Sequence, residues 1–348
     1  MLTASTDVAR KATLSECRAK FYVYKRCATR FALHLSGTRG SRGASPMRHV
    51  ACALPIILSS FIGVAGAQDL EPRLYSNLPL DINFLVLGYT RSVGNVLIDP
   101  AIELENADLT SDGPILGYAR SLGFGGLSGK FDIGLANLCL SGSATFEGEL
   151  FTRDVCGWSD ARLRIAVNFL GAPALKLREF AGYRQNLVVG ASLQLSAPIG
   201  DYDPDRLVNI GTNRWAAKTE IGVSKAVNRW LFELALAGTF YEENDDFFGG
   251  RTRKQDPIYS LQAHLVRSFD RGIWIALDAT QYQGGQTQTG GVVDRNRQSN
   301  SRFGLTLSVP INSHHSVKIN ASSGVETRTG SDFDTVGLAW QYRWGPAT

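Results

Sequence analysis

From about residue 81 to residue 344, apolar and polar residues alternate with a period of two. In the segment 160–169, for example, Leu163 and Ile165 lie on one face, while Arg162 and Arg164 lie on the other. Successive side chains of a β-strand point to opposite faces of its sheet, so this period indicates strands with one apolar and one polar side. The chain is therefore predicted to be all-β.

The alternation is interrupted at regular intervals, which divides this region into strands. The first three strands alternate less cleanly than the others, so ten or fourteen strands remain alternatives to twelve. Proline supports the division, because Pro114, Pro198, Pro257 and Pro310 fall in loops or at strand ends, where no ladder hydrogen bond is lost. The twelve predicted strands are 81–93, 113–122, 130–141, 158–169, 186–198, 215–225, 229–241, 258–269, 272–282, 301–310, 315–327 and 333–344.

The connections between these strands alternate between short and long. Short turns at one end and long loops at the other are typical of single-chain outer-membrane barrels. The exception is 170–185, which is longer than the other short connections and is expected to contain a helical turn. Tryptophans at strand ends fit the aromatic girdles of such barrels. Five of the six occupy these positions: Trp158, Trp215, Trp230, Trp274 and Trp344.

A soluble sandwich or lipocalin-type barrel would also alternate, with its apolar face inward and its charges outside. Here the polar faces carry ionisable groups of both signs among small residues, a pattern that fits a wet lumen. We therefore predict a transmembrane, antiparallel, up-and-down β-barrel of about 12 strands over 81–344, in the bacterial outer membrane. The predicted lumen-lining residues are Arg162, Arg164, Gln194, Lys218, Glu220, Glu233, Gln262, His264, Asp278, Arg302 and Arg343.

The basic charge of the chain is concentrated before the barrel. Residues 1–48 contain ten Lys or Arg against two acidic residues, a net charge of +8, whereas the whole chain carries +4. The remainder therefore has a net charge of −4, which argues against nucleic acid as a partner.

An export signal follows within this region. Met47 and Arg48 precede an uncharged stretch that ends in Ala-Gly-Ala at 65–67, which predicts a signal peptide over 47–67. A retained anchor helix is the alternative. We expect 1–46 to be a non-native upstream extension, with an organellar presequence as the alternative. Residues 68–80 would then form an N-terminal periplasmic segment, and 345–348 a tail.

Two of the five cysteines lie after the predicted signal peptide. In an oxidising compartment, Cys139 and Cys156 are expected to form a disulfide, with two free thiols as the alternative. Their spacing does not fit a zinc site. The sequence predicts no metal site and no cofactor.

The strand at 335–344 closes the barrel in this interpretation. An aromatic residue near the C-terminus resembles the signal read by the bacterial barrel-assembly machinery, although four residues, Gly-Pro-Ala-Thr, follow Trp344. We therefore expect that machinery as a partner during biogenesis, together with outer-membrane lipid and lipopolysaccharide. Lipid-facing positions are Val336, Leu338, Trp340 and Tyr342, and lumen-facing positions are Gln341 and Arg343.

Two predicted external loops contain residues that could form sites. Asp201, Asp203 and Asp205 have a calcium-like spacing, but Arg206 and Thr212 stand where an EF-hand loop needs Gly and Glu. A solvated, turn-forming loop is therefore expected.

The other loop, 244–250, pairs acidic residues with two phenylalanines. It could receive an aromatic ligand, and we expect it to fold back into the mouth of the barrel. Its residues of interest are Asp245, Asp246, Phe247 and Phe248.

The chain resembles a known family in several stretches: LGYTRSVGNVLIDP, EFAGYRQNLVVGASLQLSAPIGDYDPDRLVNIGTNRW, NDDFFGG, QDPIYSLQAHLV and TRTGSDFDTVGLAWQYRW. This is the family of outer-membrane proteins named for the meta-cleavage pathway of phenol degradation. The resemblance implies an outer-membrane barrel that admits aromatic or other apolar compounds. It supplies no catalytic residues.

Three functions follow from these patterns. The first is passive uptake of a small apolar or aromatic solute, and the second is a structural or adhesive surface barrel with an occluded lumen. A remote third is an outer-membrane lipid hydrolase, since His314 and Ser316 have a His-x-Ser spacing. That chemistry needs a lipid-facing group and an orienting partner, whereas this pair falls in a short periplasmic turn. The protein is therefore predicted not to be an enzyme.

Overall fold

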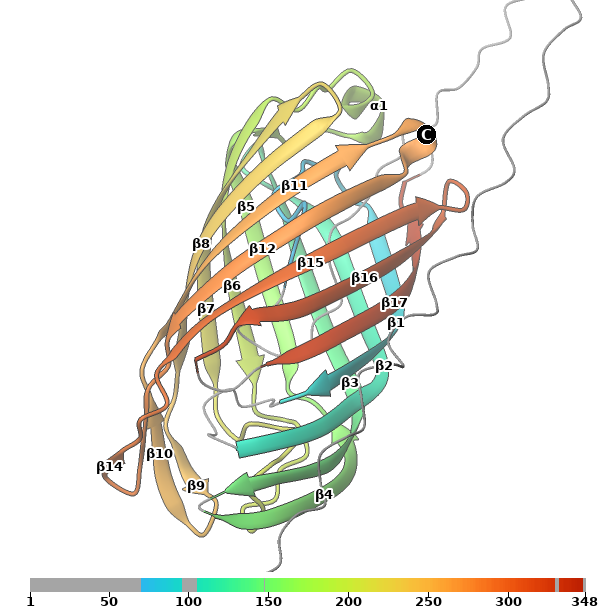
Figure 1. Cartoon of the computed structure of the whole chain (residues 1–348). Coiled ribbons are helices and arrows are strands. Elements are labelled where there is room, and N and C mark those ends of the chain that lie inside the picture. Colours follow the sequence, from blue (N-terminus) through green and yellow to red (C-terminus); the bar gives the residue numbers. More distant parts are fainter. Residues whose placement is uncertain (1–69, 96–104, 147, 329–331, 347–348) are drawn as a thin grey trace, which may run out of the picture. The chain divides into compact units, whose positions relative to one another are not determined.

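The computed structural model of the protein describes residues 70–95, 105–146, 148–328 and 332–346. The predicted signal peptide and the extension before it lie outside this part of the chain. Within it, twelve strands form a closed antiparallel barrel, because β1 pairs with both β2 and β17 (Figure 1). The strands are β1 (Asn83–Gly94), β2 (Glu105–Phe124), β3 (Leu127–Phe146), β5 (Ala161–Pro173), β6 (Leu187–Ala197), β7 (Ala216–Val227), β8 (Trp230–Tyr241), β11 (Ile258–Ser268), β12 (Trp274–Gly284), β15 (Gln298–Pro310), β16 (His315–Glu326) and β17 (Phe333–Trp344).

Further strands extend the barrel at the end with the long connections. β4 (Glu149–Trp158) pairs with the part of β3 that lies beyond its pairing with β5. A separate four-stranded sheet is formed by β9 (Asn244–Phe247), β10 (Arg251–Gln255), β13 (Thr287–Thr289) and β14 (Val292–Val293), and it projects from the same end (Figure 1). The sequence analysis did not predict these five strands.

Helices are few in the described residues. α1 (Leu177–Phe180) lies in the long connection between β5 and β6, where a helical turn was expected, and η1 (Asp270–Gly272) is a single turn between β11 and β12. The described chain contains no helix with the length and apolar character needed to cross a membrane.

The position of Pro114 differs from the prediction. It lies within β2, opposite Tyr89 of β1, and not at a strand end. The β2–β3 ladder pairs Asp112 with Cys139 and Ile115 with Ala136 but is interrupted between them. A residue without a backbone N–H is tolerated at this interruption because the ladder does not use its donor.

The outer wall of the barrel is apolar and the inner wall is polar. Outward residues such as Leu236 and Leu277 are each 57% exposed, whereas their inward neighbours Glu233 and Asp278 are buried. A soluble barrel would have the opposite arrangement. The membrane-barrel prediction is therefore confirmed, and the soluble alternative is wrong.

Four of the five strand-end tryptophans lie on the outside, as an aromatic girdle requires, and they are Trp158, Trp215, Trp230 and Trp344. Trp274 is the exception, because it is fully buried inside the barrel. The alternation of β12 explains the difference. Since Ile275 and Leu277 face outward, Trp274 must face inward.

The last strand closes the barrel as predicted. On its outer face Trp340 stacks on Tyr342 with ring centroids 6.2 Å apart, and Tyr342 stacks on Trp344 at 5.5 Å. Gln341 is buried on the inner face. These aromatic rings lie near the periplasmic end, where a girdle stabilises the barrel at the membrane interface.

Candidate functional site: the barrel lumen

The eleven predicted lumen residues all occupy inward positions of the strands. Nine of them are more than nine-tenths buried, and Arg162 and Arg343 are partly exposed. Their role in setting the polarity of a solute path stays a prediction.

The lumen is occupied by the chain that precedes β1. Residues 68–80 were expected to lie in the periplasm, but the described part, from Leu70 onward, lies inside the barrel and contacts inward residues of several strands. Leu74, Tyr75 and Leu78 are all buried there. The periplasmic assignment is therefore wrong for this segment, which we call the N-terminal segment and define as residues 70–82.

An ion-pair cluster anchors the start of the N-terminal segment. Glu71 pairs with the guanidinium of Arg164, whose Nε donates to Asp132 Oδ2 at 3.0 Å. Burial raises the pKa of the Glu71 carboxyl, but the positive charges of Arg164, Lys218 and Arg162 outweigh burial and leave the pKa below its usual value. Glu71 is therefore ionised in the lumen, where its charge is compensated by the wall.

Backbone groups of the N-terminal segment are held as well. The N–H of Arg73 donates to Glu233 Oε2, and the Lys130 ammonium donates to the carbonyls of Arg73 and Leu74. The guanidinium of Arg73 lies 5.5 Å from the centre of the Trp274 ring. These contacts reach three sides of the lumen, because β3, β8 and β12 supply them.

Tyr75 fits into a notch in the wall. Its hydroxyl donates to Glu220 Oε1 at 3.0 Å, and its ring lies over Gly190 and Gly222, which are cross-strand partners in β6 and β7. A Cβ atom at Gly190 would lie 2.4 Å from the ring, and one at Gly222 would lie 2.1 Å from it. Only glycine leaves room for the ring at these two positions.

The segment leaves the lumen at the periplasmic end. The side chain of Asn77 donates to the carbonyl of Pro173, the N–H of Leu80 donates to the carbonyl of Leu175, and the N–H of Asp81 donates to the carbonyl of Ser121. The N-terminal segment is thus fixed along its described length, and it narrows the lumen from the middle of the barrel to the periplasmic side.

A buried polar cluster lies on the wall formed by β11, β12 and β15. His264 Nδ1 is 2.7 Å from Asp278 Oδ1, and Thr306 donates to Asp278 Oδ2 at 3.0 Å. The three side chains come from adjacent strands β11, β12 and β15. The polar atoms in these contacts find their hydrogen-bond partners within the wall itself. The cluster therefore stabilises the packing of side chains against the wall.

The extracellular half of the lumen contains an apolar cluster, and the buried guanidinium groups of Arg253 and Arg302 lie over its Phe247 and Phe333 rings. The loop between β6 and β7 folds inward and places Leu207 and Ile210 against Leu138 and Leu140 of β3. We call this set the mouth cluster. Its buried residues are Leu109, Ile115, Ala136, Leu138, Leu140, Ala144, Leu207, Ile210, Phe247 and Phe333.

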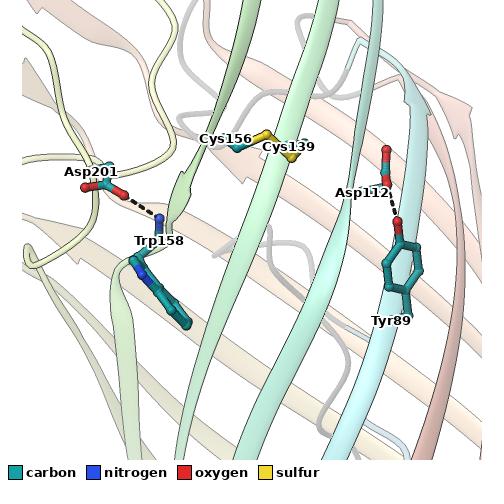
Figure 2. The surroundings of a disulfide bond; sticks show 6 residues. All are labelled: Tyr89, Asp112, Cys139, Cys156, Trp158 and Asp201. Carbon is teal, nitrogen blue, oxygen red and sulfur yellow. Dashed lines mark hydrogen bonds between the residues drawn. A yellow bond between two sulfur atoms is a disulfide. The ribbon is translucent and has the colours of Figure 1, made fainter.

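The predicted acidic loop lies beside this cluster. Asp201 Oδ2 accepts from the N–H of Trp158 at 2.6 Å, at the end of β4 (Figure 2). Asp203 Oδ1 accepts from the N–H of Asp205 at 3.0 Å. These carboxylates act as turn-forming acceptors for two different backbone segments. Among the described residues, no group of three or more His, Cys, Asp or Glu is arranged to hold a metal ion.

The loop with two phenylalanines folds back into the mouth. Phe247 is 7% exposed and belongs to the mouth cluster, and Phe248 packs against it. Asp245 and Asp246 remain exposed. Phe247 therefore packs into the interior at the mouth of the barrel.

A disulfide joins Cys139 of β3 to Cys156 of β4 (Figure 2). The two residues are direct cross-strand partners with Cα atoms 4.0 Å apart. The same two strands turn Leu138 and Val155 inward to the mouth cluster. The disulfide thus links the strands that form its wall.

The predicted His-x-Ser pair is not arranged as a catalytic unit. His314 Nδ1 is 2.9 Å from the hydroxyl of Ser313, and Ser316 donates to Gln341 at 3.3 Å. His315 stacks on Trp340 with centroids 5.4 Å apart. These partners fit a periplasmic turn beside the aromatic girdle.

A closed barrel with an apolar outer wall and a polar interior defines the class of protein, a β-barrel of the bacterial outer membrane. The family described as "Putative MetA-pathway of phenol degradation" matches residues 95–342, and the chain belongs to this family.

Solved structures resemble the chain to different degrees. The COG4313 outer membrane channel from Pseudomonas putida F1 is similar with a TM-score of 0.67 and 21% identity over 79% of this chain and 100% of that chain. The β domain of the Bordetella autotransporter BrkA gives a TM-score of 0.44 and 12% identity over 76% of this chain and 100% of that chain. No curated protein sequence matches the chain.

Proposed function

We propose that the barrel admits small apolar or aromatic compounds across the outer membrane by passive diffusion. The observation that carries this proposal is the mouth cluster, an apolar region at the extracellular end of a lumen that is otherwise lined by charge. An apolar solute gains contacts with these side chains, whereas a hydrated ion or sugar would lose its water there.

Beyond the mouth cluster, the solute meets the N-terminal segment. The segment fills the lumen between β3, β5, β7 and β8, so passage requires that it moves aside or that the solute leaves through the wall. A barrel of twelve strands is narrower than a porin, and even a partial filling restricts diffusion. The proposed pathway is therefore slow and favours small solutes.

The test is uptake of a labelled aromatic hydrocarbon by cells that lack the gene and carry variants of it. Ile210→Asp places a charge in the mouth cluster, and we expect uptake to fall by about tenfold, the effect of about 1.4 kcal/mol. Val292→Asp, at an exposed position of β14, is the matched control and should leave uptake unchanged. Equal uptake by all strains, including the deletion strain, would refute the transport function.

A structural or adhesive barrel is the second candidate. It is favoured by the contacts that the N-terminal segment makes with opposite sides of the lumen, because they brace the barrel from within. The uptake assay separates the two functions. A deletion strain with normal uptake but altered surface adhesion would support the structural role.

A further inference from the structure

The connection between β5 and β6 is the longest of the described connections between barrel strands at the periplasmic end. It comprises residues 174–186 and contains α1, which stands at the end of the barrel opposite to β9, β10 and β14 (Figure 1). We call it the periplasmic loop. Much shorter turns suffice to join neighbouring antiparallel strands, and longer loops often carry a function.

The surface of the periplasmic loop is basic. Lys176, Arg178 and Arg184 are all exposed. Glu179 is the single acidic residue of the loop, and its carboxylate already accepts a hydrogen bond from the backbone N–H of Lys176 at 3.0 Å. The loop therefore presents three cations to the periplasm with little opposing charge.

The basic surface continues onto β7 and the turn that follows it. Lys225 is exposed, and its ammonium donates to Asn186 Oδ1 at 2.5 Å. Arg229 is also exposed and pairs with Asp270 of the next turn at 2.8 Å. We call this surface the basic rim and define it as Lys176, Arg178, Arg184, Lys225 and Arg229.

The periplasmic loop exposes little apolar surface beside its cations. Its large apolar side chains are Leu175, Leu177, Phe180 and Tyr183, and each is buried or only partly exposed. Phe180 is 7% exposed, with its ring centroid 5.3 Å from that of Tyr183. A segment that enters a membrane surface combines its cations with exposed apolar side chains. Exposed positive charge alone fits a water-soluble partner with an acidic surface.

The same loop holds the base of the N-terminal segment. The N–H of Asn77 donates to Gln185 Oε1 at 3.2 Å, and the N–H of Leu80 donates to the carbonyl of Leu175 at 2.9 Å. The Gln185 amide also donates to Ser224 Oγ of β7 at 3.0 Å. A movement of the periplasmic loop therefore acts directly on the part of the N-terminal segment that leaves the lumen.

We propose that the basic rim is a docking surface for an acidic, water-soluble periplasmic protein, and that docking loosens the N-terminal segment. Carboxylates of the partner pair with the exposed cations, and displacement of Leu175 and Gln185 breaks their contacts with the segment. Exposed ion pairs are individually weak, so the partner binds transiently. Docking does not depend on the uptake of an apolar solute, and its test measures no uptake.

A short fluorescent poly-L-glutamate peptide serves as the first probe of the basic rim. We expect it to bind the purified barrel in a zwitterionic detergent, and to bind less tightly as the salt concentration rises. Removal of the three loop cations should weaken binding by about tenfold. This triple loop variant consists of Lys176→Gln, Arg178→Gln and Arg184→Gln.

The matched control removes three exposed cations from the extracellular end. It should bind the peptide as the wild type does, because the basic rim is intact. Its substitutions are Arg206→Gln, Lys254→Gln and Arg297→Gln.

Loosening of the N-terminal segment is measured by the reaction of a Ser76→Cys protein with a water-soluble thiol reagent, since Ser76 is 3% exposed. The peptide should accelerate this reaction when the basic rim is intact, but not in the triple loop variant. Gln185→Leu removes the contact with Asn77 without changing the charge of the rim. It should accelerate the reaction without the peptide and leave peptide binding unchanged, which separates docking from its effect on the segment.

The partner is identified in living cells with a photo-crosslinking amino acid in place of Arg178. We expect a cross-link to a soluble, acidic periplasmic protein. The purified form of that protein should accelerate the reaction at position 76 when the basic rim is intact, and should have no effect on the triple loop variant.

Four outcomes would overturn the proposal. Equal binding of the peptide by the wild type and the triple loop variant would refute the docking surface. Binding without any change in the reaction at position 76 would refute the effect on the N-terminal segment. Cross-links only to phospholipid or only to peptidoglycan would assign the basic rim to that partner instead. The absence of any cross-link would contradict docking in the cell.

Discussion

The ring of Tyr75 lies so close to Gly222 that a Cβ atom on this glycine would be 2.1 Å from a ring carbon. The lumen wall is therefore shaped to receive the N-terminal segment. The two residues are far apart in the sequence. A substitution of Gly222 in the wall therefore tests the position of the segment without changing the segment itself.

Gly222→Val should displace Tyr75 from its notch and loosen the N-terminal segment while the strand remains paired. The measurement is the rate at which a Ser76→Cys variant reacts with a water-soluble thiol reagent, since Ser76 is 3% exposed. We expect slow reaction with Gly222 present and a rate at least about tenfold higher in the Gly222→Val background, which corresponds to about 1.4 kcal/mol. Gly88→Ala, where the nearest atoms belong to the wall itself, is the control. Equal rates in all three proteins would mean that the notch does not hold the segment.

Arg164→Ala should destabilise the position of the N-terminal segment more than a substitution on the surface would. The reason is that it leaves Glu71 and Asp132 buried without their partner. Breaking a buried ion pair typically costs about 3–5 kcal/mol. The N-terminal segment is expected to leave the lumen, which the thiol reaction at position 76 would detect. In a second variant, Glu71→Gln keeps the shape of the side chain and should have a smaller effect. A protected position 76 in Arg164→Ala would contradict the proposed anchor.

The same anchor predicts a dependence on pH. The pKa of Glu71 is lowered in the folded protein by the positive charges around it, so the ionised carboxylate stabilises the segment above the pKa of an unfolded glutamate. This stabilisation is lost as the pH falls through the lowered pKa. We expect the Ser76→Cys protein to react faster in acid relative to a free thiol measured at the same pH, whereas the same protein with Glu71→Gln should lack this step. The same acid step in both proteins would assign it to another group.

Much of the barrel could be predicted from the sequence because of one physical fact. In the membrane the outward face of each strand must be apolar, so the alternation runs the length of β8 and through most of β11 and β12, and their bounds were predicted closely. β2 and β3 are longer than predicted because they extend beyond the apolar band. Their outer parts no longer need an apolar outward face, and the period disappears there.

The lumen was less predictable than the wall. Alternation identifies which side chains face inward, but not what fills the space between them. Leu74, Tyr75 and Leu78 show no strand or helix period, and their position depends on contacts with distant residues such as Gly190 and Gly222. A pair of inward glycines in adjacent strands was the available signal, and it becomes informative only once the register is known.

The disulfide should stabilise the extracellular end of the barrel. It closes a segment with a sequence separation of 17, and a loop of about this size is associated with about 3 kcal/mol in the chain-entropy model. We expect the double variant Cys139→Ser and Cys156→Ser to fold, but to lose protection of β4 from hydrogen exchange before the rest of the barrel. Unchanged protection of β4 would show that its pairing with β3 and the mouth cluster suffices.

Removal of residues 68–78 should open the lumen. The described part of this stretch contributes Glu71, Arg73 and Tyr75, and its loss leaves a wall of inward charged side chains free to hydrate. We expect the refolded barrel of residues 68–348 to give small or no current steps in a planar bilayer. The truncated barrel should give larger ohmic steps, because the lumen would then be a continuous aqueous path. Gly222→Val offers a second route to the same state if the truncated chain folds poorly. Large steps in the untruncated barrel, equal to those of both variants, would mean that the N-terminal segment does not restrict the lumen.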